Sequence, residues 1–274
     1  MLKDHGYSLQ ANAKKPEGAQ HPDRDAQLGY LNAQVSAFLD AGQPVVSVGS
    51  KKKENVGTYS GGGAEYAPKG EPEATNTYDL IGEAGKVARC GVYDLAANTG
   101  WVNVGTDADS GASAVESIRR WWTTVGARAY PQAKELLVTA GGGGSNGARL
   151  RLWKTQLGEL AAETGLKITV CHLPPGTSRW NTTEHRMFAA TTMSWHGRPL
   201  ETHEVVVQTI AATTSRTGLR TQAMLDTNTY QKGIKTTDQQ MKTSEAAHLQ
   251  RHDRHGEWNY TVNAAPDNST TRPP

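Results

Sequence analysis

Apolar residues recur at helical or strand spacing along most of the chain. Four of them at 3-4-3 spacing predict a helix between Pro22 and Gly42: Leu28, Leu31, Val35 and Phe38. The β-branched run "PVVSVGS" at 44–50 predicts a buried strand. Residues 51–86 hold "KKKE" and "SGGGAEYAPKGEP" and show no periodicity, so we expect a long loop or insertion there.

The pattern then becomes regular. Residues 87–106 read as two strands joined by the tight turn "AANTG", which predicts a β-hairpin. After the hairpin, helical and strand patterns alternate: a helix at 110–126, a strand at 135–140, a helix at 145–165 with Gly165 as C-cap, a strand at 166–173, and a helix that opens within 174–188 with Thr177 or Ser178 as N-cap.

This order predicts an α/β fold with one mixed sheet flanked by helices, antiparallel at its start and parallel afterwards. It is the order of a ribonuclease-H-like domain. A doubly wound Rossmann-type sheet is the main alternative, because the two patterns agree from residue 110 onward. The hairpin at 87–106 favours the ribonuclease-H-like fold, since a Rossmann half would place a helix there.

The same pattern divides the chain into four parts. We expect an N-terminal helical lead-in at 1–43 and a ribonuclease-H-like catalytic-type domain at 44–200, with the insertion at about 51–86. A C-terminal helical extension is expected at 201–262. Residues 263–274, "NAAPDNSTTRPP", have the composition of a disordered tail.

Composition narrows the class of protein. The 274 residues carry a net charge of only +2, which neither requires nor excludes a nucleic-acid partner. Two cysteines are too few for a disulfide framework. The chain has no apolar run of the roughly 20 residues that a membrane span needs, and its start lacks the apolar core of a signal peptide. We therefore expect a cytoplasmic protein without a membrane partner.

Four consecutive glycines at 141–144 raise the question of a phosphate-binding loop. Gly142, Gly144 and Gly147 spell G-x-G-x-x-G between a strand and a helix, the context of a dinucleotide-binding fingerprint. The next strand lacks the acid that would bind the ribose, because Cys171 and His172 stand at its end. A nucleotide-binding oxidoreductase stays open as the alternative function, and a flexible strand-to-helix turn as the structural explanation.

Ribonuclease-H-like nucleases suggest another interpretation of the same glycines. In these enzymes, acids after the first and fourth strands and on a later helix hold two divalent metals for phosphodiester chemistry. Here the first strand ends at Gly49 and the fourth at Gly141, while the helix after the fifth strand carries Glu184, with Asn181 one turn earlier. Two of the three expected carboxylates are thus glycines.

Several motifs in order carry a family resemblance: "GYSLQANAK", "EGAQHPDRDAQ", "GVYDLAANTGWVNVGTD", "ESIRRWW", "GGGSNGARLRLWK", "CHLPPGTSRWN", "EHRMF" and "RHGEWNYTV". Together they resemble the Rhodopirellula-type DDE transposases of bacterial insertion sequences, from Gly6 to about Val262. The resemblance implies a ribonuclease-H-like domain that cuts and rejoins DNA at transposon ends with two divalent metals, Mg²⁺ or Mn²⁺.

The sequence departs from the family's pattern at two acids. The family has Asp in "SVD-x-KKKE" and in "TAD-GGGSNG", where this chain has Gly49 and Gly141; Glu184 is kept. Two divalent ions around one carboxylate are poorly held, so we expect an inactive copy that does not bind the metals productively. The family's N-terminal helix-turn-helix region is also missing, which suggests a truncated transposase or a non-catalytic DNA-binding or regulatory remnant.

Basic and aromatic residues near these positions are candidates for DNA contact. Lys51, Lys52 and Lys53 follow the first strand and suit DNA phosphates, although a solvated charged loop has the same composition. A second candidate group precedes Glu184 in the sequence: Arg179, Trp180 and Asn181. The implied partners are transposon-end DNA and intact copies of the transposase.

Overall fold

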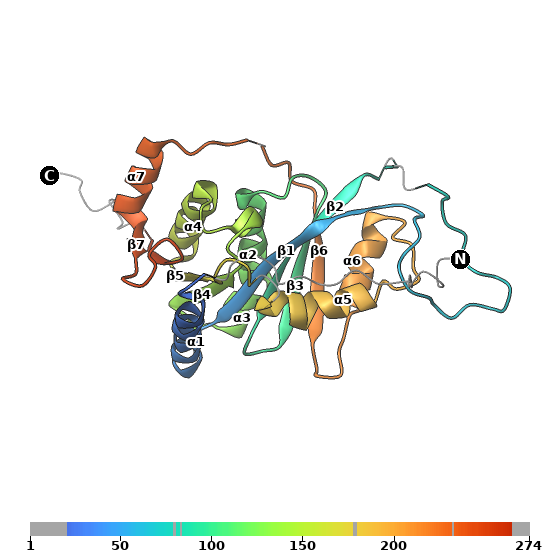
Figure 1. Cartoon of the computed structure of the whole chain (residues 1–274), viewed down its shortest axis with the longest axis horizontal. Helices are drawn as coiled ribbons and strands as arrows, with labels where there is room; N and C mark the ends of the chain where they lie inside the picture. Colours follow the sequence, from blue (N-terminus) through green and yellow to red (C-terminus); the bar gives the residue numbers. More distant parts are fainter. Residues whose placement is uncertain (1–20, 79–80, 83, 178–179, 232, 265–274) are drawn as a thin grey trace, which may run out of the picture.

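The computed structural model describes residues 21–78, 81–82, 84–177, 180–231 and 233–264. Its centre is one eight-stranded sheet with helices on both faces (Figure 1). Among the described helices, none is both long and apolar enough to cross a membrane.

The first half of the chain supplies three strands and their flanking helices. In chain order these elements are α1 (Arg24–Asp40), β1 (Val45–Asn55), β2 (Lys86–Asp94), β3 (Thr99–Gly105), α2 (Gly111–Trp121), the π-helical turn η2 (Trp122–Gly126) and α3 (Ala127–Ala129). The predicted hairpin at 87–106 is present as β2 and β3. Ser110 caps α2 through a reciprocal capping box with Ser113.

The second half alternates strands and helices and then returns to the sheet. Its elements are β4 (Glu135–Ala140), the 3₁₀ turn η3 (Gly144–Asn146), α4 (Arg151–Thr164), β5 (Lys167–His172), the π-helical segment η5 (Thr183–Phe188), α5 (Ala189–Met193), α6 (His203–Ala211), β6 (Arg220–Asp226), α7 (Asp238–His248), β7 (Leu249–Arg251) and β8 (Asn259–Val262). As predicted, Gly165 ends α4 with a left-handed backbone, at φ 71°.

The strand order is β6-β3-β2-β1-β4-β5-β8-β7. β1, β2 and β3 pair antiparallel, whereas β4 and β5 extend the sheet in parallel on the other side of β1. This confirms the predicted mixed sheet of a ribonuclease-H-like domain. A Rossmann-type half would need a crossover helix between the first two strands, and a hairpin stands in its place.

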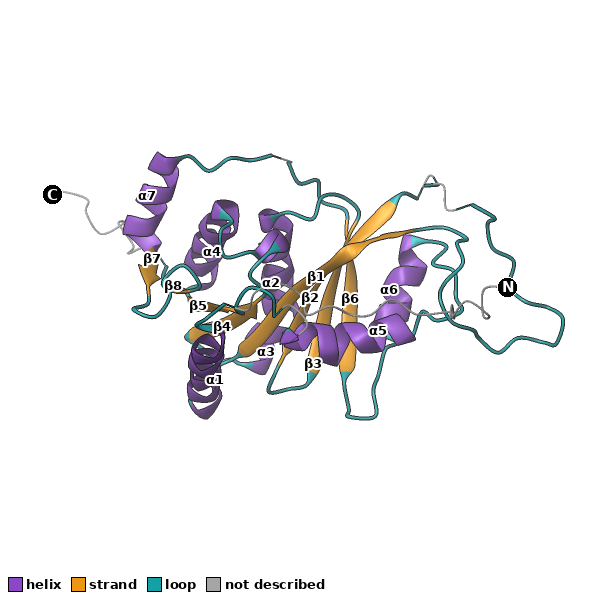
Figure 2. Cartoon of the chain, in the orientation of Figure 1, coloured by secondary structure: helices purple, strands orange, loops and turns teal. Residues whose placement is uncertain are grey.

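Two helical layers cover the sheet (Figure 2). Alternate residues of β1 face opposite layers: Val46 and Val48 pack in the cluster that contains Trp121 of α2 and Trp153 of α4. On the opposite face, one apolar cluster joins the sheet to η5 and α6, and another joins it to α1. The functional site lies on this opposite face.

β1 is longer than predicted. The expected loop from residue 51 begins only after Asn55, because β2 continues alongside and pairs with the polar end of β1, for example Lys51 with Arg89 and Glu54 with Val87. An ion pair of 2.6 Å from Arg89 to Glu54 holds the two strands together there. A polar, non-periodic sequence can thus form a strand when its neighbour supplies the backbone partners.

Other local predictions also need correction. The expected helical extension at 201–262 contributes strands as well, since β6 pairs with β3 and β8 pairs with β5. The helix expected from 145 begins at Arg151, after η3. The predicted N-cap Thr177 instead donates to the Pro174 carbonyl, and the alternative cap Ser178 lies outside the described residues.

Glycines let η5 approach the sheet closely. Gly49 of β1 pairs with Gly91 of β2, and Gly100 lies on the next strand. A Cβ atom on Gly91 would be only 2.1 Å from Met187 Cε, and one on Gly100 would be 2.5 Å from Met187 Sδ. We call Gly49, Gly91 and Gly100 the glycine notch. It is the space that η5 fills.

We predict that Gly91→Ala lowers the free energy of unfolding by about 1–3 kcal/mol, because the added methyl overpacks against buried Met187 and Phe188. The matched control is Gly105→Ala, whose Cβ would meet nothing nearer than the Ala88 carbonyl oxygen at 3.7 Å. Urea denaturation should show a change within about 0.5 kcal/mol for the control. Equal effects of the two substitutions would contradict the claim that η5 packs closely because the glycine notch lacks side chains.

Candidate functional site

Gly49 and Gly141 occupy neighbouring strands at the same level of the sheet. The parallel pairing of β1 with β4 ends at Val48 and Ala140, and each glycine follows directly. Gly49 lies within β1 rather than at its end, because β1 continues along β2. The β1–β4 pairing therefore places both glycines where these two strands separate.

Glu184 reaches this point from η5. A Cβ atom on Gly49 would lie 3.7 Å from Glu184 Oε1 and 3.2 Å from Asn181 Nδ2. The missing side chain of Gly49 thus faces the two residues that precede and begin η5. A Cβ on Gly141 would meet no heavy atom within 4 Å. A Cβ atom at either position has room, provided that at Gly49 the Asn181 amide shifts by a few tenths of an ångström.

Asn181 holds η5 against β1. Its Nδ2 donates to the Val48 carbonyl over 3.1 Å, and its Oδ1 accepts from Ser47 Oγ over 2.8 Å and from the Thr183 backbone N–H over 3.1 Å. The last contact is that of a helix N-cap. Asn181 is buried, and its Oδ1 and one N–H of its amide are used inside the protein.

Lys51 occupies the space in front of Glu184. It lies two residues beyond Gly49, hence on the same face of β1, and its Nζ forms an ion pair with Glu184 Oε2. Both side chains are only partly exposed, at 34% and 24%. The single carboxylate of the site is therefore neutralised by a cation of the chain itself.

A buried hydrogen-bond chain holds the backbone at Gly141. Trp153 Nε1 donates to Tyr260 Oη over 2.9 Å, His172 Nε2 lies 3.1 Å from that oxygen, and His172 Nδ1 lies 2.9 Å from the Gly141 carbonyl. An indole only donates and a carbonyl only accepts, so His172 carries its proton on Nδ1 and accepts at Nε2. Burial lowers the pKa of His172 to about 4, which keeps the ring neutral.

The nearby acids have other structural roles. Asp94 caps the turn of the β2–β3 hairpin and accepts from the Tyr130 hydroxyl. It pairs with Val46, on the far side of Val48 from Gly49. Asp107 accepts from the Tyr230 backbone N–H. These contacts leave no second carboxylate beside Glu184 among these residues.

The described residues do not fit a pair of divalent ions. Such a site needs several oxygen ligands, most of them carboxylates. In the described part of the chain, no three His, Cys, Asp or Glu side chains gather in a way that would hold a metal. Glu184 alone remains of the predicted acid set, and Lys51 pairs with it.

The predicted DNA-contact residues surround this position unevenly. Lys52 and Lys53 are exposed, whereas Lys51 turns inward to Glu184. Trp180 is 42% exposed, and the Arg24 guanidinium lies 5.5 Å from the centre of its ring. Arg179 lies outside the described residues. The structure thus leaves Lys52, Lys53 and Trp180 accessible to a ligand.

The glycine-rich loop lacks the geometry of a dinucleotide site. α4 begins at Arg151, beyond Gly147, so the loop does not open directly into the N-terminus of a helix. Asn146 at its centre is buried and donates to the Val48 carbonyl over 3.0 Å. The loop closes onto β1, and nothing in its contacts favours the oxidoreductase alternative.

A family profile described as "Rhodopirellula transposase DDE domain" matches residues 1–264. The chain belongs to this family. No relative was found among curated proteins by sequence.

Solved structures with a similar fold include three complexes of Mos1 transposase. The paired-end complex with the left transposon end has a TM-score of 0.47 at 12% identity, over 76% of this chain and 59% of that one. A pre-cleavage transpososome gives 0.45, also at 12% identity and the same coverages. The strand transfer complex gives 0.44 at 11% identity, over 76% and 58%. The chain thus spans less than two thirds of the Mos1 chains.

Sequence reasoning missed two residues next to the site. Arg89 lies across from Lys51 on β2 and is 3% exposed. His172 was noted only for its place beside Cys171, whereas its contact to the Gly141 carbonyl links it to the site. A basic residue inside an otherwise apolar strand, as in "VARCGVY", was the one signal available for Arg89.

We predict that His172 makes the protein less stable as the pH falls. The unfolded chain binds the proton near pH 6.5 and the folded chain only near pH 4. The free energy of unfolding should therefore decrease between these values, by up to about 3 kcal/mol. Urea denaturation at several pH values should show a shallower pH dependence for His172→Gln. His185→Gln, at an exposed position, should keep the wild-type slope. Identical slopes for all three proteins would contradict a buried neutral His172.

Proposed function

We propose that this chain is a DDE-transposase-family domain that binds DNA but does not cut it. The observation that carries the proposal is the environment of Glu184. This carboxylate faces the missing side chain of Gly49 and forms an ion pair with Lys51. The family's chemistry requires divalent metals, and the residues that would hold them are reduced to one.

In this proposal the chain has lost two metal-ligating side chains, but the backbone at Gly49 and Gly141 is still held in place. Gly49 keeps its pairing with Gly91, and Gly141 keeps its carbonyl contact to His172. Neither glycine has the positive φ that would strain another residue. A carboxylate at both positions should therefore be tolerated, and the site should regain metal ligands without a change of fold.

DNA is the proposed partner, on the strength of family membership and of the exposed basic residues beside the site. Lys52 and Lys53 follow Lys51 on β1 and are exposed, with Lys52 on the face of the strand opposite to Lys51, and Trp180 is 42% exposed. We place the pairing with intact transposase copies second, because it rests on family membership alone. Inhibition of an intact family member by this chain in a mixing experiment is its test.

We predict that the unmodified chain binds Mn²⁺ weakly and does not nick DNA. The double variant Gly49→Asp, Gly141→Asp should bind Mn²⁺ on the order of 100-fold more tightly, since affinity rises with the number of charged ligands. Each single variant should gain much less, because acids that share metals act together. Isothermal titration calorimetry measures the affinity, and supercoiled plasmid reports the nicking.

The matched control is Gly49→Asn, Gly141→Asn, which adds side chains of the same shape without charge. It should fold like the double aspartate variant and bind no more Mn²⁺ than the unmodified chain. Metal-dependent cleavage of DNA by the unmodified chain would contradict the proposal that the chain does not cut DNA. A folded aspartate variant that gains no metal affinity over the asparagine control would show that the site is assigned to the wrong residues.

We predict that DNA binding depends steeply on salt and that Lys52 contributes to it. Replacement of one phosphate-contacting lysine reduces the slope of log affinity against log salt by about 1. Lys52→Ala should show this reduction in fluorescence anisotropy with a short duplex. Lys134→Ala, at an exposed lysine just before β4, should leave the slope unchanged. Equal slopes for both variants would remove Lys52 from the interface.

A further inference from the structure

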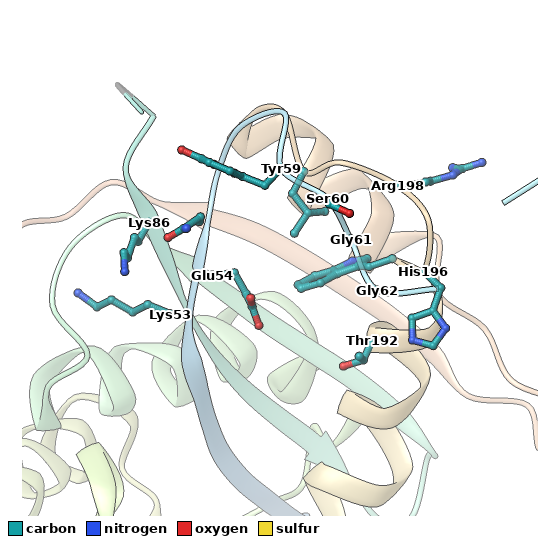
Figure 3. A pocket seen from close by; sticks show the side chains of 13 residues that line it. Lys53, Glu54, Tyr59, Ser60, Gly61, Gly62, Lys86, Thr192, His196 and Arg198 are labelled. Carbon is teal, nitrogen blue, oxygen red and sulfur yellow. The ribbon is translucent and has the colours of Figure 1, made fainter. Parts of the chain in front are cut away.

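A cleft opens where β1 and β2 leave the sheet, beyond Glu184. Its volume is about 510 Å³, and Lys53, Glu54 and Lys86 line one side while Trp195, His196 and Arg198 line the other. Figure 3 shows Lys53 and Lys86 together on one side of this cleft, opposite His196 and Arg198. Of these residues, only Lys53 has been given a functional role above, as a proposed DNA contact.

Three buried hydrogen-bond donors without partners belong to Trp195, which lines the cleft, and to Arg89, which stacks on it. Trp195 is 7% exposed, and its buried Nε1 has no hydrogen-bond partner. Directly behind it, the Arg89 guanidinium stacks at 4.1 Å from the centre of the Trp195 ring, and its buried Nε and Nη1 are also without partners. All three orphaned atoms are donors. Buried donors of this kind are commonly satisfied by a water or an ion.

The charges around the cleft also favour an acceptor. Lys53 and Lys86 are exposed and form no ion pair within the described part of the chain. The lining acid Glu54 is neutralised by Arg89, 2.6 Å away, and Arg198 is paired with Glu65. Burial lowers the pKa of Arg89 to about 10, so the guanidinium keeps its charge at neutral pH. Two lysine charges thus remain uncompensated.

We infer that this cleft is a phosphate-binding site. A phosphate group offers mainly acceptors and a negative charge, which suits the Lys53 and Lys86 ammonium groups at the rim, and the Trp195 side chain in the wall reports on its binding. Such a group comes either from a DNA strand or from a free nucleotide. The inference uses neither Glu184 nor the two glycine positions; because Lys53 also belongs to the proposed DNA-contact residues, a DNA strand as the source rests on the proposed function, whereas a free nucleotide does not.

The test uses the full chain and follows the Trp195 indole N–H signal by NMR, assigned with Trp195→Phe. The probes are inorganic phosphate, dAMP, adenosine and a short single-stranded oligodeoxynucleotide. We expect saturable shifts with the three phosphate-bearing probes and none with adenosine. Lys86→Ala should weaken phosphate binding about tenfold, as expected for one charge-assisted contact. Lys242→Ala, at an exposed lysine of α7, should have no effect.

The affinities of the oligodeoxynucleotide and of dAMP distinguish the two possible sources of the phosphate group. Binding of the oligonucleotide at least tenfold tighter than dAMP assigns the cleft to a DNA strand, and comparable affinities assign it to a free nucleotide. The absence of any Trp195 shift with the phosphate-bearing probes, or a shift that Lys86→Ala leaves unchanged, would overturn the inference. Lys51 and Lys52 are unaltered throughout, so the Lys52 salt-slope experiment fails or succeeds independently.

Discussion

The close seating of η5 in the glycine notch is the constraint on which the rest of the site depends. Met187 and Phe188 are fully buried against strands that carry no side chain at Gly91 and Gly100. Asn181 lies just before the same segment, and its amide donates to the Val48 carbonyl of β1. Because packing at one end and hydrogen bonds at the other fix η5, Glu184 is held against β1 whether or not a metal is present.

Because η5 is fixed in this way, the glycines at positions 49 and 141 change the side chains of the site and not the position of its backbone. The sheet and η5 form a complete frame around Gly49 and Glu184, the position where we propose that two carboxylates are missing, and Lys51 forms an ion pair with Glu184. In a partly exposed site an ion pair of this kind contributes little stability, of the order of 0–1 kcal/mol. Its consequence is electrostatic: the site carries no excess negative charge with which to attract divalent cations.

Much of the fold was predictable because the sheet's central strands are apolar and its hairpin has a clear turn. β4, with the sequence "ELLVTA", was predicted at its observed bounds. β6, with the sequence "RTQAMLD", was not predicted because its residues are largely polar or exposed. It lies at the edge of the sheet, and pairing with β3 stabilises it as a strand. The acid positions stay a prediction from the family resemblance, whereas the contacts of Arg89 and His172 could not be predicted because they depend on residues distant in sequence.

The central claim is that Lys51, rather than a metal, neutralises Glu184 in this chain. A crystal structure of the unmodified protein soaked in Mn²⁺, with anomalous scattering recorded for manganese, tests it directly. The account predicts no anomalous peak beside Glu184, and electron density for the Lys51 ammonium against the carboxylate. One or two manganese peaks coordinated by Glu184, with Lys51 displaced, would contradict it.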